Sequence, residues 1–504
     1  MAEDAAAEDA EHARAGRLGG ARWARLLPAL ALGGVLVAYL FHRHQLDLRF
    51  PVPWPDEGSF LWQALAFRDH FSLFAPEVNP EREVLWMPPG FMVLEGLVFE
   101  LVPFSLSAAR TLSALFVCGA LACVFAGVRR VETKLLFPLL AALCAFCPIV
   151  SMAGNVARME GLELFVLSLA FLLLERRRGA SLGVLLLAPL VHPNGIFGIA
   201  VGVPCWLLRA RGRRGVMRPA DWLVIGVALV AWAIYGLHIS QHWADLVRDI
   251  GAQLRFKRFV SASDGGTLGR LTQPVVAGAI LLLAGALVAA RQTRDRLGAM
   301  GAFAAALLLQ TTLAAGWLYE VYPAFAVLVT SVVSADAAFA FIAAKVPGRA
   351  RLRAVAGTAL AFIVVVAFAY RHNRFLERSL ENSTVLRGSL APEYFVAADR
   401  EAIERYLESL VPPDASRPLS VQFLPDADAL LFEKERRPRL DYVQQTFYEH
   451  RYDVLLVHES AWFPPFVRNL ELIKLLWAKG GAYETRVVYE RDGSERWTAY
   501  SWPR

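Results

Sequence analysis

The stretch LVIGVALVAWAIYGL, residues 223–237, contains no charged residue and decides the fold class. Comparable apolar runs cover residues 26–41, 275–290 and 355–370. A helix needs about 17–25 residues to cross a bilayer core about 30 Å thick, and these runs approach or reach that length. The sequence therefore predicts an α-helical polytopic membrane protein.

The composition of the whole chain agrees with this prediction. Of its 504 residues, 56% are hydrophobic and 19% are charged, and the mean hydropathy is +0.40. Soluble domains carry about 25% charged residues, so the composition excludes a disordered chain and disfavours an ordinary soluble enzyme. The net charge is +6, but the arginines form short clusters between apolar runs. Such clusters are topology signals, and we expect no nucleic-acid partner.

The basic clusters also predict the orientation. Short loops rich in Lys and Arg stay in the cytoplasm. The clusters lie at residues 14–25, 129–134, 176–178, 209–218, 291–296 and 345–353. All of them face inward if the outer loop 43–106 contains no crossing. Residues 88–103 then lie in the outer interface, in agreement with Glu95 and Glu100, because acids are costly in lipid.

This orientation gives about eleven transmembrane helices. They are predicted at 26–42, 107–128, 133–150, 158–174, 180–191, 194–208, 221–239, 273–290, 297–316, 321–343 and 352–370. The two short spans around His192 can also form a re-entrant hairpin. Residues 1–25 are predicted to be a disordered cytoplasmic head, and residues 26–370 to be the transmembrane domain. All five cysteines lie in apolar stretches, so we predict no disulfide framework and interpret Cys144 and Cys147 as packing residues.

Residues 371–504 are richer in charge and are predicted to form a small α/β domain outside the cytoplasm. The patterns predict helices over 393–410 and 466–479. The segments SVQFL, YDVLLVHE and YETRVVYE have the character of strands. Asp453, His458 and Glu459 lie near a strand end, where polar residues are usually solvated.

Two adjacent acids open a predicted helix in the first outer loop. Asp56 and Glu57 belong to PWPDEG, and the apolar residues of 59–70 can pack one helix face. Acids in a first helical turn also serve capping and the helix dipole, so a structural interpretation stays open. About thirty residues later, WMPPG opens the interfacial segment, and Arg110 begins the next span.

A second charged group lies at the outer end of the following pair of spans. The segment NVARMEGLELF contains Asn155, Arg158, Glu160 and Glu163. The positive-inside rule does not explain an arginine there. Ionisable groups at a membrane boundary usually pair together or line a functional cavity. A purely structural pair of Arg158 with Glu160 or Glu163 remains the alternative.

This order of motifs resembles the GT-C glycosyltransferases, most closely the family 39 type. That type includes protein O-mannosyltransferases, lipid A aminoarabinose transferases and bacterial relatives that use polyprenyl-phosphate sugars. The likeness in layout covers most of the chain, and its specific motifs occupy residues 53–115 and 154–195. The resemblance implies an inverting glycosyltransferase in the cytoplasmic (inner) membrane, with a cytoplasmic N-terminus. It implies transfer from a polyprenyl-phosphate sugar donor to a lipid, polysaccharide or protein acceptor on the outer side.

The resemblance also assigns roles to residues. Asp56 matches the acid that acts as general base or orients the acceptor, and Glu57 matches its neighbour. Glu160 corresponds by region and chemistry to an acid of the second outer turn. Met87 replaces the basic residue that relatives carry before Pro-Pro. The cation that binds the donor phosphate is therefore open among Arg82, Arg158, His192 and the basic run 255–258.

The sequence indicates no clear metal site or cofactor. Several GT-C enzymes bind a divalent cation, and Asp56 and Glu57 could help hold one.

The expected chemistry needs cations for the departing phosphate and a carboxylate base for the acceptor hydroxyl. A single displacement then inverts the anomeric configuration. Two other functions stay open: a transporter or flippase of a lipid-linked glycan, and a noncatalytic envelope-assembly protein. A transporter would place ionisable groups near mid-membrane in broken spans, whereas here most acids lie at the outer boundary, which favours the enzyme.

Overall fold

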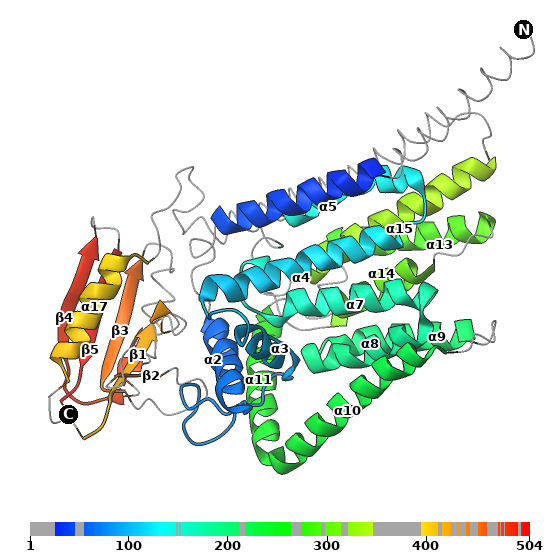
Figure 1. The fold of residues 1–504 in the computed structure, drawn as a ribbon. Coiled ribbons are helices and arrows are strands. Elements are labelled where there is room, and N and C mark those ends of the chain that lie inside the picture. The colour runs from blue at the N-terminus through cyan, green and yellow to red at the C-terminus, as the bar shows by residue number, and fades with distance from the viewer. Residues whose placement is uncertain are drawn as a thin grey trace, which may run out of the picture.

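The structure is a computed structural model. It describes residues 26–45, 55–147, 150, 153–210, 217–263, 274–293, 298–313, 321–345 and 395–411, and, with short gaps, 416–503. The described chain forms a bundle of long helices and a separate five-stranded sheet with one flanking helix (Figure 1).

The bundle helices coincide with the spans expected from the sequence. They are Leu26–Gln45, α4 (Leu106–Gly127), α5 (Val131–Ala145), α7 (Met159–Arg176), α8 (Arg178–Val191), α9 (Gly195–Ala210), α10 (Pro219–Gln241), α13 (Pro274–Thr293), α14 (Gly298–Leu313) and α15 (Val321–Lys345). The expected span 352–370 lies outside the described residues.

Several of these helices have the character of membrane spans. Within the described residues, four are long and apolar enough to cross a membrane: Leu26–Gln45, Leu106–Gly127, Pro219–Gln241 and Val321–Phe341. Only about a tenth of the α10 window is buried inside the protein, so most of its apolar surface faces outward. This exposure is expected of a helix that contacts lipid. The prediction of a helical protein with several apolar helices is confirmed, while the number eleven stays a prediction.

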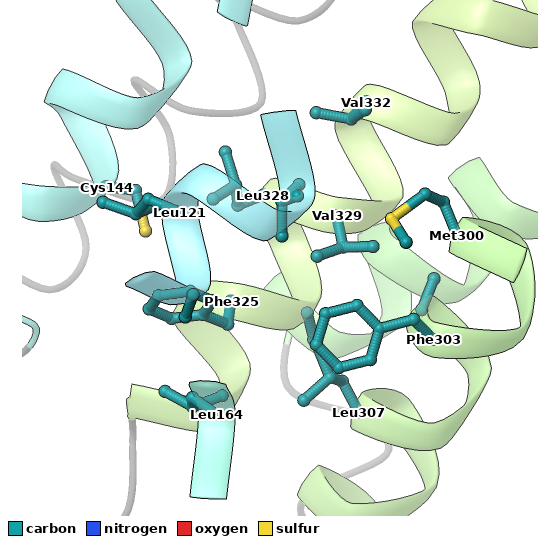
Figure 2. Packing of buried hydrophobic residues seen from close by; sticks show 14 of the residues in the cluster. Leu121, Cys144, Leu164, Met300, Phe303, Leu307, Phe325, Leu328, Val329 and Val332 are labelled. Atoms are coloured by element: carbon teal, nitrogen blue, oxygen red, sulfur yellow. The ribbon is translucent and has the colours of Figure 1, made fainter. Parts of the chain in front are cut away.

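A compact core holds the bundle together between α4, α5, α7, α14 and α15. Leu121, Leu164, Phe303 and Phe325 pack there, and Figure 2 shows them side by side. Cys144 is buried in the same core, which agrees with its interpretation as a packing residue. Close packing of this kind fixes the positions of the helix ends, where the charged residues lie.

The segment predicted to be the first outer loop forms two helices, α2 (Pro55–His70) and α3 (Gly90–Phe99). With 10 residues, α3 is too short to cross a bilayer, as expected for 88–103. Two glycines permit its close packing. A Cβ on Gly96 would lie 2.7 Å from the carbonyl oxygen of Ala64 in α2, and one on Gly90 would lie 2.5 Å from that of Leu190 in α8. The outer helices are therefore fixed directly on the bundle.

The C-terminal sheet has the strand order β2-β1-β3-β5-β4. Its elements are α17 (Ala397–Ser409), β1 (Leu419–Leu424), β2 (Leu440–Val443), β3 (Val454–Ser460), β4 (Glu484–Arg491) and β5 (Glu495–Ser501). β1 pairs in parallel with β2 and β3, and β5 pairs antiparallel with β3 and β4. The expected α17, β1, β3 and β4 are present, β2 and β5 were not expected, and residues 466–471 of the expected helix 466–479 lie outside the described ones.

The polar residues near the end of β3 have structural partners. Arg417 donates two hydrogen bonds to Asp453, at 2.9 and 2.7 Å. The pKa of Arg417 is raised above its ordinary value by this hydrogen bonding. His458 is fully buried and stacks on the ring of its cross-strand partner Trp497, with centroids 4.1 Å apart. Thr498 bonds Glu459. These contacts stabilise the sheet, and we assign no site to them.

Candidate functional site

Glu57 is the buried anchor of the candidate site. Its carboxylate accepts two hydrogen bonds from Arg110 of α4, Nε to Oε1 at 2.9 Å and Nη2 to Oε2 at 2.7 Å. The backbone N–H of Ala157 donates a third, at 2.6 Å. Glu57 and Arg110 are both 0% exposed. Because two parallel N–H bonds fix a carboxylate in orientation as well as position, Glu57 ties α2 to α4 and to the segment before α7.

Asp56, the preceding residue, belongs to a second ion-pair group. Arg158, the N-cap of α7, donates through Nη1 to Asp56 Oδ2, and through Nη2 to Glu160 Oε1 at 2.9 Å. The Asp56 side chain is 33% exposed, whereas those of Arg158 and Glu160 are 8% and 6% exposed. Among the described residues, no hydrogen bond reaches Asp56 Oδ1. Asp56 is therefore the acid of this group that an outside molecule can reach.

Aromatic rings support this group from the side of the outer loop. The guanidinium carbon of Arg158 lies 5.9 Å from the ring centroid of Phe60, one turn along α2 from Asp56. Phe60 stacks on Trp86 with centroids 5.2 Å apart. Trp86 belongs to the WMPPG segment that leads into α3. The position of that loop thus affects the position of Arg158 through two contacts.

A third polar group begins one helical turn after Glu160. The carboxylate of Glu163 is fully buried and accepts hydrogen bonds from Tyr322 Oη at 2.5 Å and Gln310 Nε2 at 3.3 Å. His192 Nδ1 lies 3.2 Å from Glu163 Oε2. These contacts join α7, α14, α15 and the turn between α8 and α9. These pairings could not be predicted from the sequence, because the partners lie as many as 159 residues apart.

The expected cations occupy three different environments. Arg158 lies between Asp56 and Glu160, and His192 faces Glu163. Arg82 donates to Asp249 of α11 (Trp243–Ser263), with distances of 2.9 and 2.6 Å. The hydrogen bonds to Asp249 raise the pKa of Arg82 above its ordinary value. The structure thus brings Asp56, Glu57, Arg158 and Glu160 together with His192 nearby, while the side chains of the expected run 255–258 lie outside the described ones.

Arg43 is a further buried cation that the sequence analysis did not identify. Arg43 lies near the end of the first helix, and its guanidinium donates three hydrogen bonds. They go from Nη1 to Thr111 Oγ1 at 2.6 Å, from Nε to Asn155 Oδ1 at 3.0 Å and from Nη2 to the Ser107 carbonyl at 3.1 Å. Its side chain joins that helix to α4 and to the segment before α7. A signal was available, because an arginine at the predicted outer end of a span is as unexplained by the positive-inside rule as Arg158.

Glu95 of α3 is buried without a compensating partner. It is 0% exposed, and within the described residues neither carboxylate oxygen has a hydrogen-bond partner. Burial raises the pKa of Glu95 well above the ordinary value of 4.5, and the nearby negative charge of Glu57 raises it further. The folded protein therefore favours the neutral acid.

We expect the stability of the protein to depend on pH through Glu95. A raised folded-state pKa stabilises the fold below pH 4.5, and this contribution is lost as the pH rises through the folded-state value. Glu95→Gln should therefore flatten the decline of the unfolding midpoint above pH 4.5. The measurement is thermal unfolding in detergent from pH 5 to 9. Glu100→Gln, at the exposed C-cap of α3, is the control and should follow the original chain; parallel curves for all three proteins would contradict the prediction.

Comparisons with known proteins give structural neighbours only. No protein-family model matches the chain, and no curated protein matches it in sequence. The fold is similar to ArnT from Cupriavidus metallidurans bound to undecaprenyl phosphate, with 18% identity, a TM-score of 0.49 and coverage of 94% of this chain and 97% of that chain. The apo state of that protein gives 16% identity, a TM-score of 0.47 and the same coverage.

A third neighbour is the Archaeoglobus fulgidus oligosaccharyltransferase in complex with Zn and sulfate. It has 14% identity and a TM-score of 0.38, and the match covers 84% of this chain and 67% of that chain.

Proposed function

We propose that the protein is an inverting glycosyltransferase of the cytoplasmic membrane. It takes a sugar from a polyprenyl-phosphate donor and transfers it to a lipid, polysaccharide or protein acceptor outside the cytoplasm. Besides the donor and acceptor, its partner is membrane lipid. The observation that carries the proposal is the position of Asp56, a partly exposed carboxylate fixed beside a buried network of charged groups at the end of the helix bundle.

Asp56 is the general base in this proposal. Arg158 fixes Oδ2, and Glu57, the next residue in α2, is fixed by Arg110 and the Ala157 N–H. Oδ1 of Asp56 then accepts the proton of the acceptor hydroxyl. At the same time, the hydroxyl oxygen of the acceptor attacks the anomeric carbon of the donor sugar. The sugar–phosphate bond breaks on the opposite face, so the configuration inverts. Glu57 has a positioning role, because its carboxylate already accepts three hydrogen bonds.

Arg158 is the cation that we propose for the departing phosphate. All three candidates face carboxylates, but Arg158 alone pairs directly with the proposed base, whereas the partners of Arg82 and His192 are Asp249 and Glu163. Arg158 faces two carboxylates, Asp56 and Glu160, so the group carries an excess negative charge. A phosphate therefore needs further positive charge from the protein besides Arg158.

The function can be tested with a panel of radiolabelled polyprenyl-phosphate sugars. Purified protein in lipid vesicles is supplied with each donor and with an extract of envelope lipids, glycans and proteins. We expect one donor to release free polyprenyl phosphate and to label an acceptor covalently. Asp56→Asn protein at matched folding should do both at least about 100-fold more slowly.

The same vesicles separate the enzyme from a transporter. A flippase of a lipid-linked glycan would move the intact donor between leaflets, without any new covalent product. Movement without release of polyprenyl phosphate would overturn the proposal. A noncatalytic assembly protein would show neither reaction, and its envelope function would survive Asp56→Asn.

A further inference from the structure

Glu163 is a buried carboxylate that the proposed mechanism does not use. It lies three residues after Glu160 in α7, and residues three apart share one helix face. The Glu163 side chain is 0% exposed, and that of Glu160 is 6% exposed. Because the Glu163 carboxylate is fully covered by protein, it can act on a donor or an acceptor only through other residues.

The contacts of Glu163 fix the first turn of α7 from the interior of the bundle. Tyr322 of α15 donates to Oε2 at 2.5 Å, and Gln310 of α14 donates to Oε1 at 3.3 Å. His192, in the turn between α8 and α9, places Nδ1 3.2 Å from Oε2. Partners on three sides leave the carboxylate one orientation. The helical turn that carries Glu163 is therefore fixed in rotation as well as in position.

The opposite face of the same turn packs closely on α4. Gly161 and Glu163 are two residues apart, so their side-chain positions lie on roughly opposite faces of α7. A Cβ on Gly161 would lie 2.9 Å from the carbonyl oxygen of Ser113, so the two backbones approach closely there. Arg158 is the N-cap of this turn. Any shift or rotation of the turn therefore moves the guanidinium of Arg158 relative to Asp56.

A second path from Glu163 to Arg158 runs through the predicted outer loop. The turn that carries His192 packs on the start of α3, since a Cβ on Gly90 would lie 2.5 Å from the carbonyl oxygen of Leu190. The WMPPG segment ends at Gly90, and its tryptophan stacks on the phenylalanine ring that supports Arg158. The contacts of Glu163 thus support Arg158 both through the backbone of α7 and through this loop.

Stability alone does not account for a carboxylate at this position. The neighbouring core of α7, α14 and α15 is apolar, with Leu164, Phe303 and Phe325 packed together (Figure 2). Exchanging buried charged pairs for apolar side chains of similar volume is often neutral or stabilising, so apolar residues could also hold the helices together. A hydrogen-bonded polar group instead specifies one arrangement of the helices. The exact position of the α7 start is therefore the property that Glu163 contributes.

We propose that Glu163 is a positioning residue for sugar transfer, and that its contacts with Tyr322, Gln310 and His192 hold Arg158 in place beside Asp56. The inference rests on the proposed function, in which Arg158 stabilises the departing phosphate. A displacement of about 1 Å in an active site can lower a rate about 100-fold. The charge on the phosphate grows in the transition state, so misplacing Arg158 lowers the rate of the chemical step more than the affinity for the donor.

The test compares Glu163→Gln and Tyr322→Phe with the original protein in lipid vesicles. Glutamine keeps the shape of Glu163 but has one oxygen, so it cannot accept from Tyr322 and Gln310 at two oxygens as the carboxylate does. Tyr322→Phe removes a single hydroxyl group and remains informative if Glu163→Gln does not fold. We expect both variants to lower the single-turnover rate at saturating donor by about 10–100-fold, with the donor KM changed less than about threefold.

Ser168→Ala is the matched control for a purely structural effect. Ser168 is a buried polar residue of the same helix and donates to the carbonyl of Phe165. We expect Ser168→Ala to lower the unfolding midpoint and to transfer sugar at the original rate. The proposal would be overturned if Glu163→Gln and Tyr322→Phe behaved like Ser168→Ala, or if they raised the donor KM without slowing the chemical step.

A double-variant cycle on stability needs no transfer activity. If Arg158 links Glu163 to Asp56, the midpoint shift of Glu163→Gln with Asp56→Asn should differ from the sum of the single shifts by at least about 1 °C. Glu163→Gln with Asp69→Asn, at the far end of α2, should be additive. Original protein that transfers no sugar would count against the proposed function, and the cycle would still be measurable. Additive shifts in both pairs would overturn the positioning role.

Discussion

Asp56→Asn is expected to lower the rate of sugar transfer by about 10²–10⁴-fold, the range that a positioned general base contributes. Asparagine has nearly the shape of aspartate and can still accept a hydrogen bond from Arg158 through its side-chain oxygen. It cannot take the acceptor's proton. Because Asp56 is 33% exposed, we expect a small effect on folding. The measurement is the single-turnover rate at saturating donor, with an unfolding curve on the same sample.

Two further variants make this result specific. Asp69→Asn removes an acid at the other end of α2, where its ion pair with Arg68 is exposed, and should leave transfer unchanged. Asp56→Glu keeps the carboxylate but moves it by about one methylene, and should retain partial activity. If Asp56→Asn transferred sugar at the original rate, Asp56 would not be the base. The neighbouring acid Glu160 would then be the next candidate.

Arg110→Met is expected to destabilise the protein by about 3–5 kcal/mol, or to prevent folding. The substitution leaves the carboxylate of Glu57 fully buried without its cation. Glu57 would retain the hydrogen bond from the Ala157 N–H, which compensates only part of the charge. Thermal or denaturant unfolding in detergent measures the loss, and the yield of folded protein serves where the variant is too unstable.

A double variant separates two effects of Arg110→Met on stability: the loss of the ion pair itself, and the cost of leaving the Glu57 carboxylate buried without its cation. Glu57→Leu with Arg110→Met removes both charges and should recover much of the stability, because replacing a whole buried pair by apolar side chains is often neutral. Arg68→Met provides the surface comparison and should cost at most about 1 kcal/mol, since its partner Asp69 is 44% exposed. An Arg110→Met protein as stable as Arg68→Met would show that the pair with Glu57 does not hold the helices together.

The helices of the bundle were predictable because lipid imposes one strong rule on sequence. Backbone groups in the hydrocarbon must bond within a helix, so apolar length alone locates a span such as α10. The orientation of the basic clusters, together with Glu95 and Glu100, identified the segment of α3 as one that does not cross. The C-terminal strands followed a weaker signal. β1 and β3 are buried apolar runs, whereas β5, ERWTAYS, mixes charged and polar residues with its buried Trp497 and Ala499, and its pattern is not distinctive.

The sequence predicted which residues belong to the candidate site, but it did not predict which of them contact each other. Asp56 and Arg158 stood out because each is a charge at the outer edge of an apolar segment. Their partners follow from packing between helices, which sequence spacing does not encode. Glu57 bonds Arg110 at a separation of 53 residues and the Ala157 N–H at a separation of 100. Arg82 was also predicted as a candidate cation for the donor phosphate. In the structure, its guanidinium donates to Asp249, 167 residues away, and this partner was not predictable from the sequence.

The contacts of Arg43 set an order on the making of the protein. Its guanidinium belongs to the first helix, yet its partners come 64 residues later, at the Ser107 carbonyl, and 112 residues later, at Asn155. During synthesis, Arg43 is therefore made well before Ser107 and Asn155. The hydrogen bonds from Arg43 to Thr111 and Ser107 can form only after α4 has been synthesised. The proposed catalytic end of the molecule is thus completed only after about a third of the chain has been synthesised.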